Sequence, residues 1–201
     1  MSKLFCIMGK SASGKDTIYK RLIQDGELCL KTIVSYTTRP MREGERDGVE
    51  YHFVTEDVLK ALIDAGKVIE CRDYDTVHGI WSYFTVDDGQ VDFDGEQDAI
   101  IIGTLESYAQ IRIFYGKNNV IPIYVNVEDG ERLSRALNRE KQQDEPKYLE
   151  LCRRFLADAK DFSEEKLRDC EIHKVYENID MDVCLNEIRG DILKFRNREH
   201  S

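Results

Sequence analysis

Residues 9–17 read Gly-Lys-Ser-Ala-Ser-Gly-Lys-Asp-Thr and form a glycine-bounded turn between an apolar run and a segment of helical periodicity. The spacing GxxxxGK is that of a phosphate-binding loop. Its two glycines allow a tight turn whose N–H groups approach an anion, and the following helix directs its positive end to the same place. Lys15 adds a mobile cation for the outer phosphates of a nucleoside triphosphate. The loop therefore predicts a strand–loop–helix unit that binds a nucleotide.

An ordinary Gly/Ser turn is the alternative interpretation, and the position of the loop between a strand and a helix disfavours it. The residues expected to contact the triphosphate are Gly9, Lys10, Ser11, Ala12, Ser13, Gly14, Lys15, Asp16 and Thr17. One of them departs from the usual pattern, because Asp16 stands where a Ser or Thr hydroxyl ordinarily meets Mg²⁺. By itself the loop indicates a nucleotide and leaves the reaction open.

The composition narrows the class of protein and of partner. The chain has 201 residues, enough for one α/β core with insertions, and 34% of them are charged. The net charge is −10 and no run of Lys or Arg stands out, so a nucleic-acid polymer is not an expected partner. A bound polyphosphate must then be held by a local cluster of arginines within a repulsive overall field.

The six cysteines bear on the cellular compartment. They form no Cys-x-x-Cys pair and several fall on apolar faces, so we expect reduced core residues rather than disulfides or a zinc site. The N-terminus enters a strand without a signal peptide, and no apolar stretch is long enough to cross a membrane. These features favour a cytoplasmic protein with no membrane partner, and they leave monomer and homodimer both open.

Apolar runs and helical periodicity alternate along the chain. Strands are expected at residues 3–8, 30–34, 67–71, 99–102, 120–127 and 172–176, with an aromatic-rich strand pair over 72–85. Helices are expected from the phosphate loop to Gly26 and over 55–66, 105–115, 128–160 (interrupted at 142–146) and 180–195. This alternation predicts a parallel sheet with helices on both faces, although Pro122 argues against a central place for its strand.

The segment from residue 35 to residue 54 is dense in Arg, Glu, Gly and hydroxyl side chains, without helical or strand periodicity before Tyr51. A polar loop of this length inside a compact domain is usually functional or disordered, and its regular flanks argue against disorder. Arg39 and Arg42 can grip a phosphate dianion through forked hydrogen bonds, and Tyr51 can donate to the same phosphate. A solvated charged loop is the alternative.

Several features occur in one order over nearly the whole chain. They are the phosphate loop, the motifs Ser-x-Thr-Thr-Arg-x-x-Arg-x-Gly-Glu and Asp-Gly-x-x-Tyr-x-Phe-Val within residues 35–54, a glutamate in the next strand (Glu70) and a late arginine-rich helix. In this arrangement the chain resembles the guanylate kinase family, for which the 35–54 segment is specific. The resemblance implies an enzyme that transfers the γ-phosphoryl group of ATP in line to GMP or dGMP, with Mg²⁺.

The resemblance also implies the architecture, an α/β fold with a parallel-sheet P-loop kinase core flanked by helices. The core would comprise residues 1–34, 86–130 and 161–201 of a single domain. A small mixed β insertion for the acceptor nucleotide would comprise residues 35–85, and a helical lid residues 131–160.

The acceptor site follows from the same resemblance. The residues implied to bind the acceptor are Ser35, Arg39, Arg42, Glu45, Tyr51, Glu70, Tyr83 and Thr85. The arginines and tyrosines of this set are assigned to the phosphate, whereas Ser35, Glu70 and Thr85 are assigned to guanine. A carboxylate suits guanine because it accepts from N1–H and the 2-amino group together, and adenine offers no such pair of donors.

Arg135 and Arg139 lie four residues apart and therefore on one face of a helix. A solvated helix face is the ordinary interpretation of such a pair. In a chain with a phosphate loop they can instead close over the triphosphate as a lid and stabilise charge on the transferring group. The resemblance implies Arg154 as a third such residue, for which Arg153 is the alternative. The expected catalytic residues are Lys15, Arg39, Arg135, Arg139 and Arg154.

Two positions depart from the family pattern. Asp16 replaces the hydroxyl after the loop lysine, and Ile102-Gly103-Thr104 stands where the family has an aspartate-rich strand end. Ligands bind at the carboxyl ends of parallel strands, so a carboxylate is missing from a functional edge. We hypothesise that Asp16 reaches Mg²⁺ while Thr17 donates to a phosphate oxygen. Glu106 is the second candidate for the metal, a different way of holding it stays open, and a helix cap is the alternative role for Asp16.

Two other functions remain open. One is a related P-loop kinase with a different phosphorylated acceptor, such as a deoxynucleotide or a phosphorylated sugar. The other is a catalytically impaired guanylate-kinase-like interaction module. Lys15, Arg39, Arg42 and Arg135 are all present, which argues against the module, because a chain without catalysis has no reason to keep the lysine of the phosphate loop.

Overall fold

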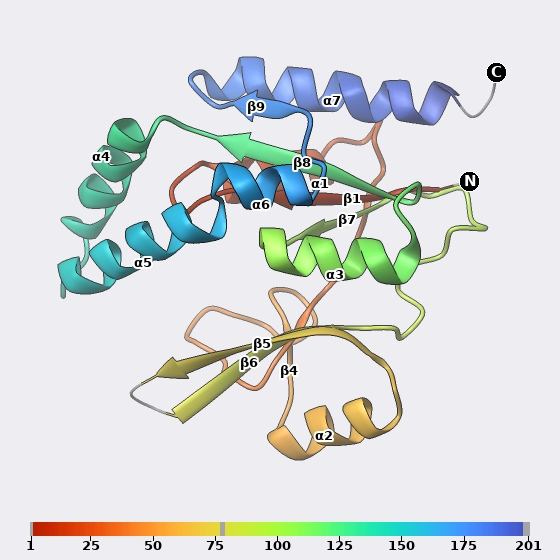
Figure 1. Cartoon of the computed structure of the whole chain (residues 1–201), viewed down its shortest axis with the longest axis horizontal. Helices are drawn as coiled ribbons and strands as arrows, with labels where there is room; N and C mark the ends of the chain where they lie inside the picture. The colour runs from red at the N-terminus through yellow and green to blue at the C-terminus, as the bar shows by residue number, and fades with distance from the viewer. Residues whose placement is uncertain (1, 77–78, 199–201) are drawn as a thin grey trace.

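The computed structural model describes residues 2–76 and 79–198. Its larger sheet has five strands in the order β2-β7-β1-β8-β9, and every neighbouring pair is parallel. The strands are β1 (Leu4–Met8), β2 (Lys31–Thr32), β7 (Ala99–Ile102), β8 (Val120–Asn126) and β9 (Val175–Glu177). The expected parallel sheet is therefore confirmed, and Figure 1 shows helices on both sides of it.

Strand β1 is apolar throughout because it is covered on both faces. The helices are α1 (Lys15–Ile23), α2 (Glu56–Asp64), α3 (Leu105–Tyr115), α4 (Asp129–Glu140), α5 (Tyr148–Asp161), α6 (Glu164–Asp169) and α7 (Met181–Arg198). Phe5 and Ile7 of β1 share one core cluster with buried residues of α1 and α7. Leu4 and Cys6 belong to the cluster on the other face, with residues of α3. Because alternate residues of β1 pack on opposite layers of helices, the strand lies between these two layers. The loop that follows β1 therefore lies at the carboxyl edge of the sheet.

Pro122 lies in an inner strand, contrary to the sequence expectation. It pairs with Cys6 of β1 on one side. On the other side β9 reaches β8 only from Tyr124 onward, where Tyr124 pairs with Val175. The proline thus sits in a stretch of β8 that has one neighbouring strand, so the missing N–H leaves no gap in the ladder.

A second sheet of four strands lies below the core in Figure 1, with α2 beside it. Its strands are β3 (Tyr36–Thr37), β4 (His52–Phe53), β5 (Val68–Thr76) and β6 (Gly79–Val86). The order is β4-β3-β6-β5, in which β3 and β4 are parallel and the other pairs antiparallel. Leu59 of α2 packs on Phe84 and Val86 and gives this sheet a small core of its own.

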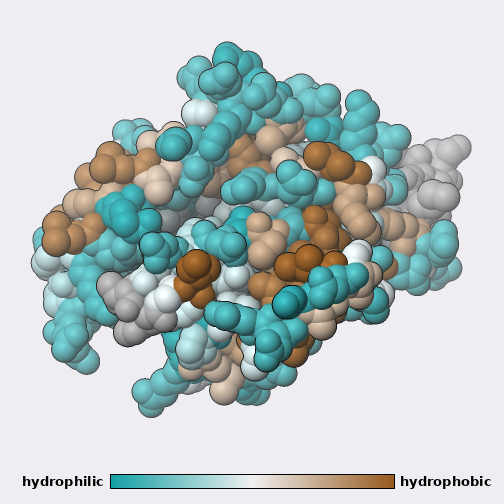
Figure 2. Space-filling model, turned by 60° about the horizontal axis from the view of Figure 1, so that its bottom comes forward, coloured by the Kyte–Doolittle hydropathy of each residue, from teal (hydrophilic) through white to brown (hydrophobic). Residues whose placement is uncertain are grey.

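Some local features differ from the sequence expectations. The short strands β3 and β4 interrupt the polar segment, and α6 was not predicted. All six cysteines lie among the described residues and are free thiols, but Cys6 and Cys184 alone are buried, so the expectation that the cysteines are core residues holds for those two. Within residues 2–76 and 79–198, no helix combines the length and apolarity needed to span a membrane. Figure 2 shows a mainly hydrophilic face with separate hydrophobic patches.

Candidate functional site

The phosphate loop requires glycine at both of its fixed positions. Gly14 has φ +86°, in the left-handed region, and a Cβ there would lie 2.3 Å from Nδ2 of Asn178. A Cβ on Gly9 would lie 2.4 Å from the carbonyl oxygen of Val125 in β8. The backbone contact excludes a side chain at Gly9, and the left-handed φ disfavours one at Gly14, so the tight path of the loop between β1 and α1 depends on these residues.

Three side chains from distant parts of the chain hold the loop. Asp158 of α5 accepts the Ser11 N–H at 2.8 Å, and Arg132 of α4 donates to the Ser11 carbonyl at 3.3 Å and to Asp158 at 2.9 Å. Asn178 donates to the Ser13 carbonyl at 2.8 Å. None of these three anchors was predicted from the sequence. For Arg132 and Asp158 the signal is weak, because polar residues on a charged helix are usually solvated, yet Arg132 is only 1% exposed and stacks over Phe155.

The hydroxyl of Ser13 is an unpaired polar group at the centre of this loop. Ser13 is buried, and its Oγ makes no hydrogen bond within the described chain. Such a group ordinarily has a partner when it is buried. A phosphate oxygen is an acceptor of the right kind, so this atom fits a bound polyphosphate.

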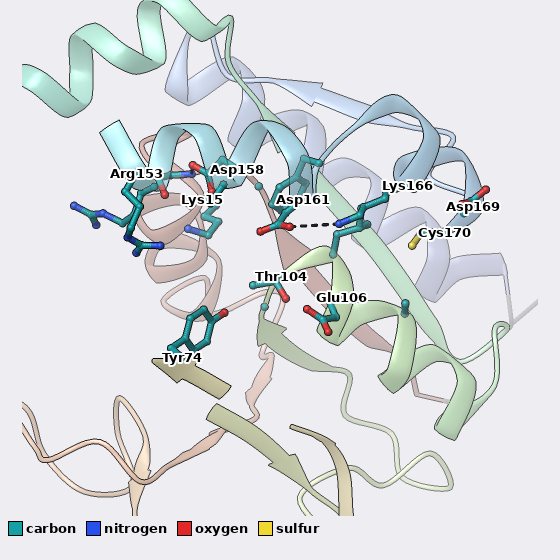
Figure 3. A pocket seen from close by; sticks show the side chains of 18 residues that line it. Lys15, Tyr74, Thr104, Glu106, Arg153, Asp158, Asp161, Lys166, Asp169 and Cys170 are labelled. Carbon is teal, nitrogen blue, oxygen red and sulfur yellow. Dashed lines mark hydrogen bonds and ion pairs between the residues drawn. The ribbon is translucent and has the colours of Figure 1, made fainter. Parts of the chain in front are cut away.

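Lys15 opens onto a cavity of about 590 Å³ between the core, the second sheet and α5. Figure 3 shows Lys15, Arg153 and Tyr74 gathered at one end, and Glu106 and Asp161 farther along. Glu106 therefore shares a cavity with the loop lysine. Asp16, in contrast, is 71% exposed and lies 3.1 Å from Lys15 Nζ, and it lines other hollows.

The arginines expected to form a lid lie on two sides of the loop. Arg135 and Arg139 line a hollow of about 420 Å³ with Gly14 and Thr17. Arg154 and Arg153 line the larger cavity with Lys15. Glu150 accepts from Arg153 at 2.7 Å and lies 3.6 Å from the Nε of Arg154, which is an ion pair without a hydrogen bond. Both arginines therefore share one carboxylate at the wall of this cavity.

Arg39 is the centre of a compact polar cluster in the second sheet. It is 3% exposed and makes a two-pronged pair with Glu45, with both N···O distances at 2.9 Å. Its Nε donates to the Tyr83 hydroxyl at 3.1 Å, and its guanidinium lies over the ring of Tyr51. The Arg39 pair holds the pKa of the Glu45 carboxyl below its usual value, and burial raises the pKa of Tyr51. Arg42 is exposed, and its N–H donates to Glu45 at 2.7 Å.

A second cluster surrounds Glu70, which is 6% exposed. The Thr85 hydroxyl donates to its Oε1 at 2.7 Å. Arg72, which was not predicted from the sequence, also contacts this carboxylate, with Nε 2.8 Å from Oε2. The spacing Glu70-x-Arg72 on a strand is the signal that was available, because alternate residues share a face. Ser35 lines a different hollow of about 440 Å³, beside Tyr51.

Comparisons with known proteins identify related sequences. The family model described as Guanylate kinase matches residues 1–180. The guanylate kinase of Alkalilimnicola ehrlichii is 31% identical over 147 residues, which are 73% of this chain and 69% of the relative. The guanylate kinase of Cupriavidus pinatubonensis is 26% identical over 197 residues, 98% of this chain and 87% of that protein.

One solved structure bears on the fold. The crystal structure of guanylate kinase from Anaplasma phagocytophilum has a TM-score of 0.65 with this chain at 18% sequence identity. The match covers 96% of this chain and 85% of that chain. The two proteins therefore share their architecture over most of their lengths.

Proposed function

The chain belongs to the guanylate kinase family, and on that premise we propose that it phosphorylates GMP or dGMP with ATP as donor and Mg²⁺ as cofactor. The observation that carries the proposal is the pairing of a phosphate loop, whose Ser13 hydroxyl lacks a partner, with the polar cluster around Arg39. One site suits a triphosphate and the other a monophosphate. A transfer between them requires positioning and charge stabilisation rather than a covalent intermediate.

The donor site is built from residues 9–17. Backbone N–H groups of the loop and the start of α1 hold the phosphates of ATP, and Lys15 contacts the outer ones. The Ser13 hydroxyl and that of Thr17 donate to phosphate oxygens. Arg135, Arg139 and Arg154 neutralise charge on the transferring group from both sides of the loop, as their places in two adjoining hollows suggest.

The acceptor site is built on the second sheet. Arg39, Arg42, Tyr51 and Tyr83 bind the phosphate of GMP, and Glu45 orients Arg39 through its two hydrogen bonds. The residues assigned to the guanine base are Ser35, Glu70 and Thr85. This division corresponds to an acceptor-binding insertion of residues 35–85 and a lid of residues 131–160 on a core formed by the rest.

Mg²⁺ prefers hard oxygen ligands and commonly binds through one carboxylate, phosphates and waters. Among the described residues, no cluster of His, Cys, Asp and Glu is arranged to hold a metal by itself, so a site completed by phosphates suits this chain. Asp16 beside Lys15 is the first candidate ligand, and Glu106 in the main cavity is the second. When bound, the ion would neutralise charge on the phosphate groups.

A coupled assay of ADP release tests the proposal. GMP and dGMP should be phosphorylated far faster than AMP, CMP or a sugar phosphate, and ATP should serve as donor. Lys15→Ala should lower kcat by about 10²-fold or more, because a charge at the transferring group is lost. Lys60→Ala, a change of an exposed lysine on α2, is the matched control and should leave the rate unchanged. Release of ADP with a sugar phosphate alone would favour a related kinase, and nucleotide binding without turnover would favour an interaction module.

A further inference from the structure

Arg72 lies in the middle of the proposed base-binding cluster. It follows Glu70 by two residues on β5, so both side chains are on the same face, and it pairs across the hairpin with Tyr83 of β6. Its side chain is 14% exposed. A cation buried beside the carboxylate that is assigned to guanine changes which hydrogen bonds that carboxylate can still make.

Glu70 has little acceptor capacity left. A carboxylate offers about four lone-pair positions, two on each oxygen. Oε1 accepts from the Thr85 hydroxyl at 2.7 Å and from Nη2 of Arg72 at 3.4 Å. Oε2 accepts from Nε of Arg72 at 2.8 Å. One position on Oε2 therefore remains, which is enough for one of the two donor groups that guanine presents along this edge.

The side chains at the end of β7 supply no second acceptor. Residues 102–104 carry no carboxylate. The Thr104 hydroxyl oxygen already accepts from the Ser107 N–H at 3.2 Å and from Nη1 of Arg72 at 3.3 Å, so both of its lone pairs are used. The 2-amino group of guanine thus meets neither an open position on Thr104 nor a second one on Glu70.

Arg72, in contrast, has more N–H donors than its bonds to Glu70 and Thr104 use. A guanidinium has five N–H donors, and three of them make the bonds to Glu70 and Thr104. The pair of Glu70 and Arg72 therefore presents one acceptor beside free donors. Its complement is a ring N–H next to a carbonyl, the lactam edge that guanine and hypoxanthine share at N1 and C6.

We propose that Arg72 is a specificity-determining residue. Together with Glu70 it forms hydrogen bonds to the lactam edge of the acceptor base, and neither residue binds the 2-amino group. The acceptors are then 6-oxopurine nucleoside monophosphates as a class, and IMP is used alongside GMP. This inference rests on the proposed function. Adenine presents a donor at C6 and an acceptor at N1, the reverse order, and is excluded.

Initial rates of the wild-type protein with GMP, IMP and AMP test the substrate class. The ratio of kcat/KM for GMP to that for IMP should be below about 100, because a site built to bind a group rejects analogues without it much more strongly. AMP should be a worse substrate than either. A GMP/IMP ratio above about 100 overturns the inference and leaves the proposed function standing. Turnover of neither oxopurine overturns both.

Two variants test the residue itself. Arg72→Ala removes the donor to C6=O and frees Glu70 for the 2-amino group, so kcat/KM should fall about 10-fold or more for IMP and less for GMP, raising the GMP/IMP ratio. Arg72→Lys keeps the positive charge but lacks the parallel N–H donors of the guanidinium, so it should raise the GMP/IMP ratio by a smaller factor. This second variant keeps the proposal testable if the alanine variant does not fold. Lys60→Ala is the control. An unchanged ratio in both variants overturns the role of Arg72.

Discussion

Asp16 sets a carboxylate where phosphate loops ordinarily carry a hydroxyl, at the start of α1. It lies 3.1 Å from Lys15 Nζ and is otherwise exposed. A carboxylate beside a triphosphate is repelled unless a cation lies between them. We predict that Asp16→Ser raises the Mg²⁺ concentration for half-maximal rate several-fold and hardly changes the KM for GMP, as measured by initial rates in a Mg²⁺ titration.

The competing role for Asp16 is a favourable charge at the helix N-terminus. In that case Asp16→Ser lowers the melting temperature slightly and the Mg²⁺ titration is unchanged. Glu106→Gln then becomes the informative variant, because Glu106 shares the cavity of Lys15.

Glu45 gives the second prediction at this scale, a pH-dependent contribution to stability. Arg39 lowers the pKa of Glu45 below its usual 4.5. A carboxyl whose pKa is depressed on folding stabilises the protein above its unfolded-state pKa, and this stabilisation is lost as the pH falls through the folded-state pKa. Glu45→Gln should thus cost about 1–3 kcal/mol of unfolding free energy at pH 7, and the difference from wild type should shrink below pH 4.5.

Urea unfolding at several pH values measures this difference. Glu43→Gln is the matched control, since Glu43 is exposed two residues away and should show no deficit at any pH. A Glu45→Gln deficit that is equal at pH 7 and pH 4 contradicts the ionised pair.

The family resemblance assigned Arg39, Glu45 and Tyr51 to one acceptor site, and these three residues lie together in the structure. The resemblance did not predict Arg72 or Arg132. The spacing to Glu70 was an available signal for Arg72. The contacts of Arg72 with Thr104 and of Arg132 with Ser11 join distant elements, and a single sequence carries no signal of such long-range contacts.

At the scale of elements, α4 and α5 are joined to the phosphate loop by the buried pair of Arg132 and Asp158. Their side chains are 1% and 17% exposed, and both contact Ser11. Arg132 is also paired with Asp129 at 3.0 Å, but that carboxylate is half-exposed. Removing Asp158 therefore leaves the buried guanidinium only partly compensated, whereas replacing both Asp158 and Arg132 by apolar groups is expected to cost less.

We predict that Asp158→Ala lowers the unfolding free energy by about 3 kcal/mol and that adding Arg132→Met restores part of it. Urea unfolding of both single variants and the double variant measures the coupling. The control is Glu150→Ala on the same helix, whose partner Arg153 is exposed, and this should cost less than about 1 kcal/mol. Additive effects of Asp158 and Arg132 speak against a coupled clamp.

Elements with strong periodicity were predicted well, and the failures have physical reasons. Strand β7 and helix α3 have the bounds that their apolar patterns indicated. The two-residue strands β3 and β4 are too short to show an alternation, and α6 is a single short polar helix. Pro122 led to the wrong prediction that its strand is not central, because the sequence does not reveal how far a neighbouring strand extends.

At the scale of the whole molecule, the positions of the charged residues matter more for phosphate binding than the net charge does. The net charge is −10, yet the arginines assigned to phosphates form two groups, one in the part of the second sheet and the other on α4 and α5, on different sides of the loop. Arg39 and Arg135 are each paired with a carboxylate of their own part of the molecule, Glu45 and Glu131. Phosphates bound between the two parts add an anion that attracts the arginines of both.

We therefore predict that the second sheet and the lid approach each other when both nucleotides bind. A compact chain of this length has a radius of gyration of roughly 16 Å, and small-angle scattering should show it decrease in two steps, with GMP and then with a non-transferable ATP analogue. Arg139→Ala should weaken the second step and leave the first, because Arg139 lines the hollow beside the phosphate loop and not the acceptor cluster. An unchanged radius at saturating concentrations of both nucleotides contradicts closure and implies that the arginines are already positioned for the transfer.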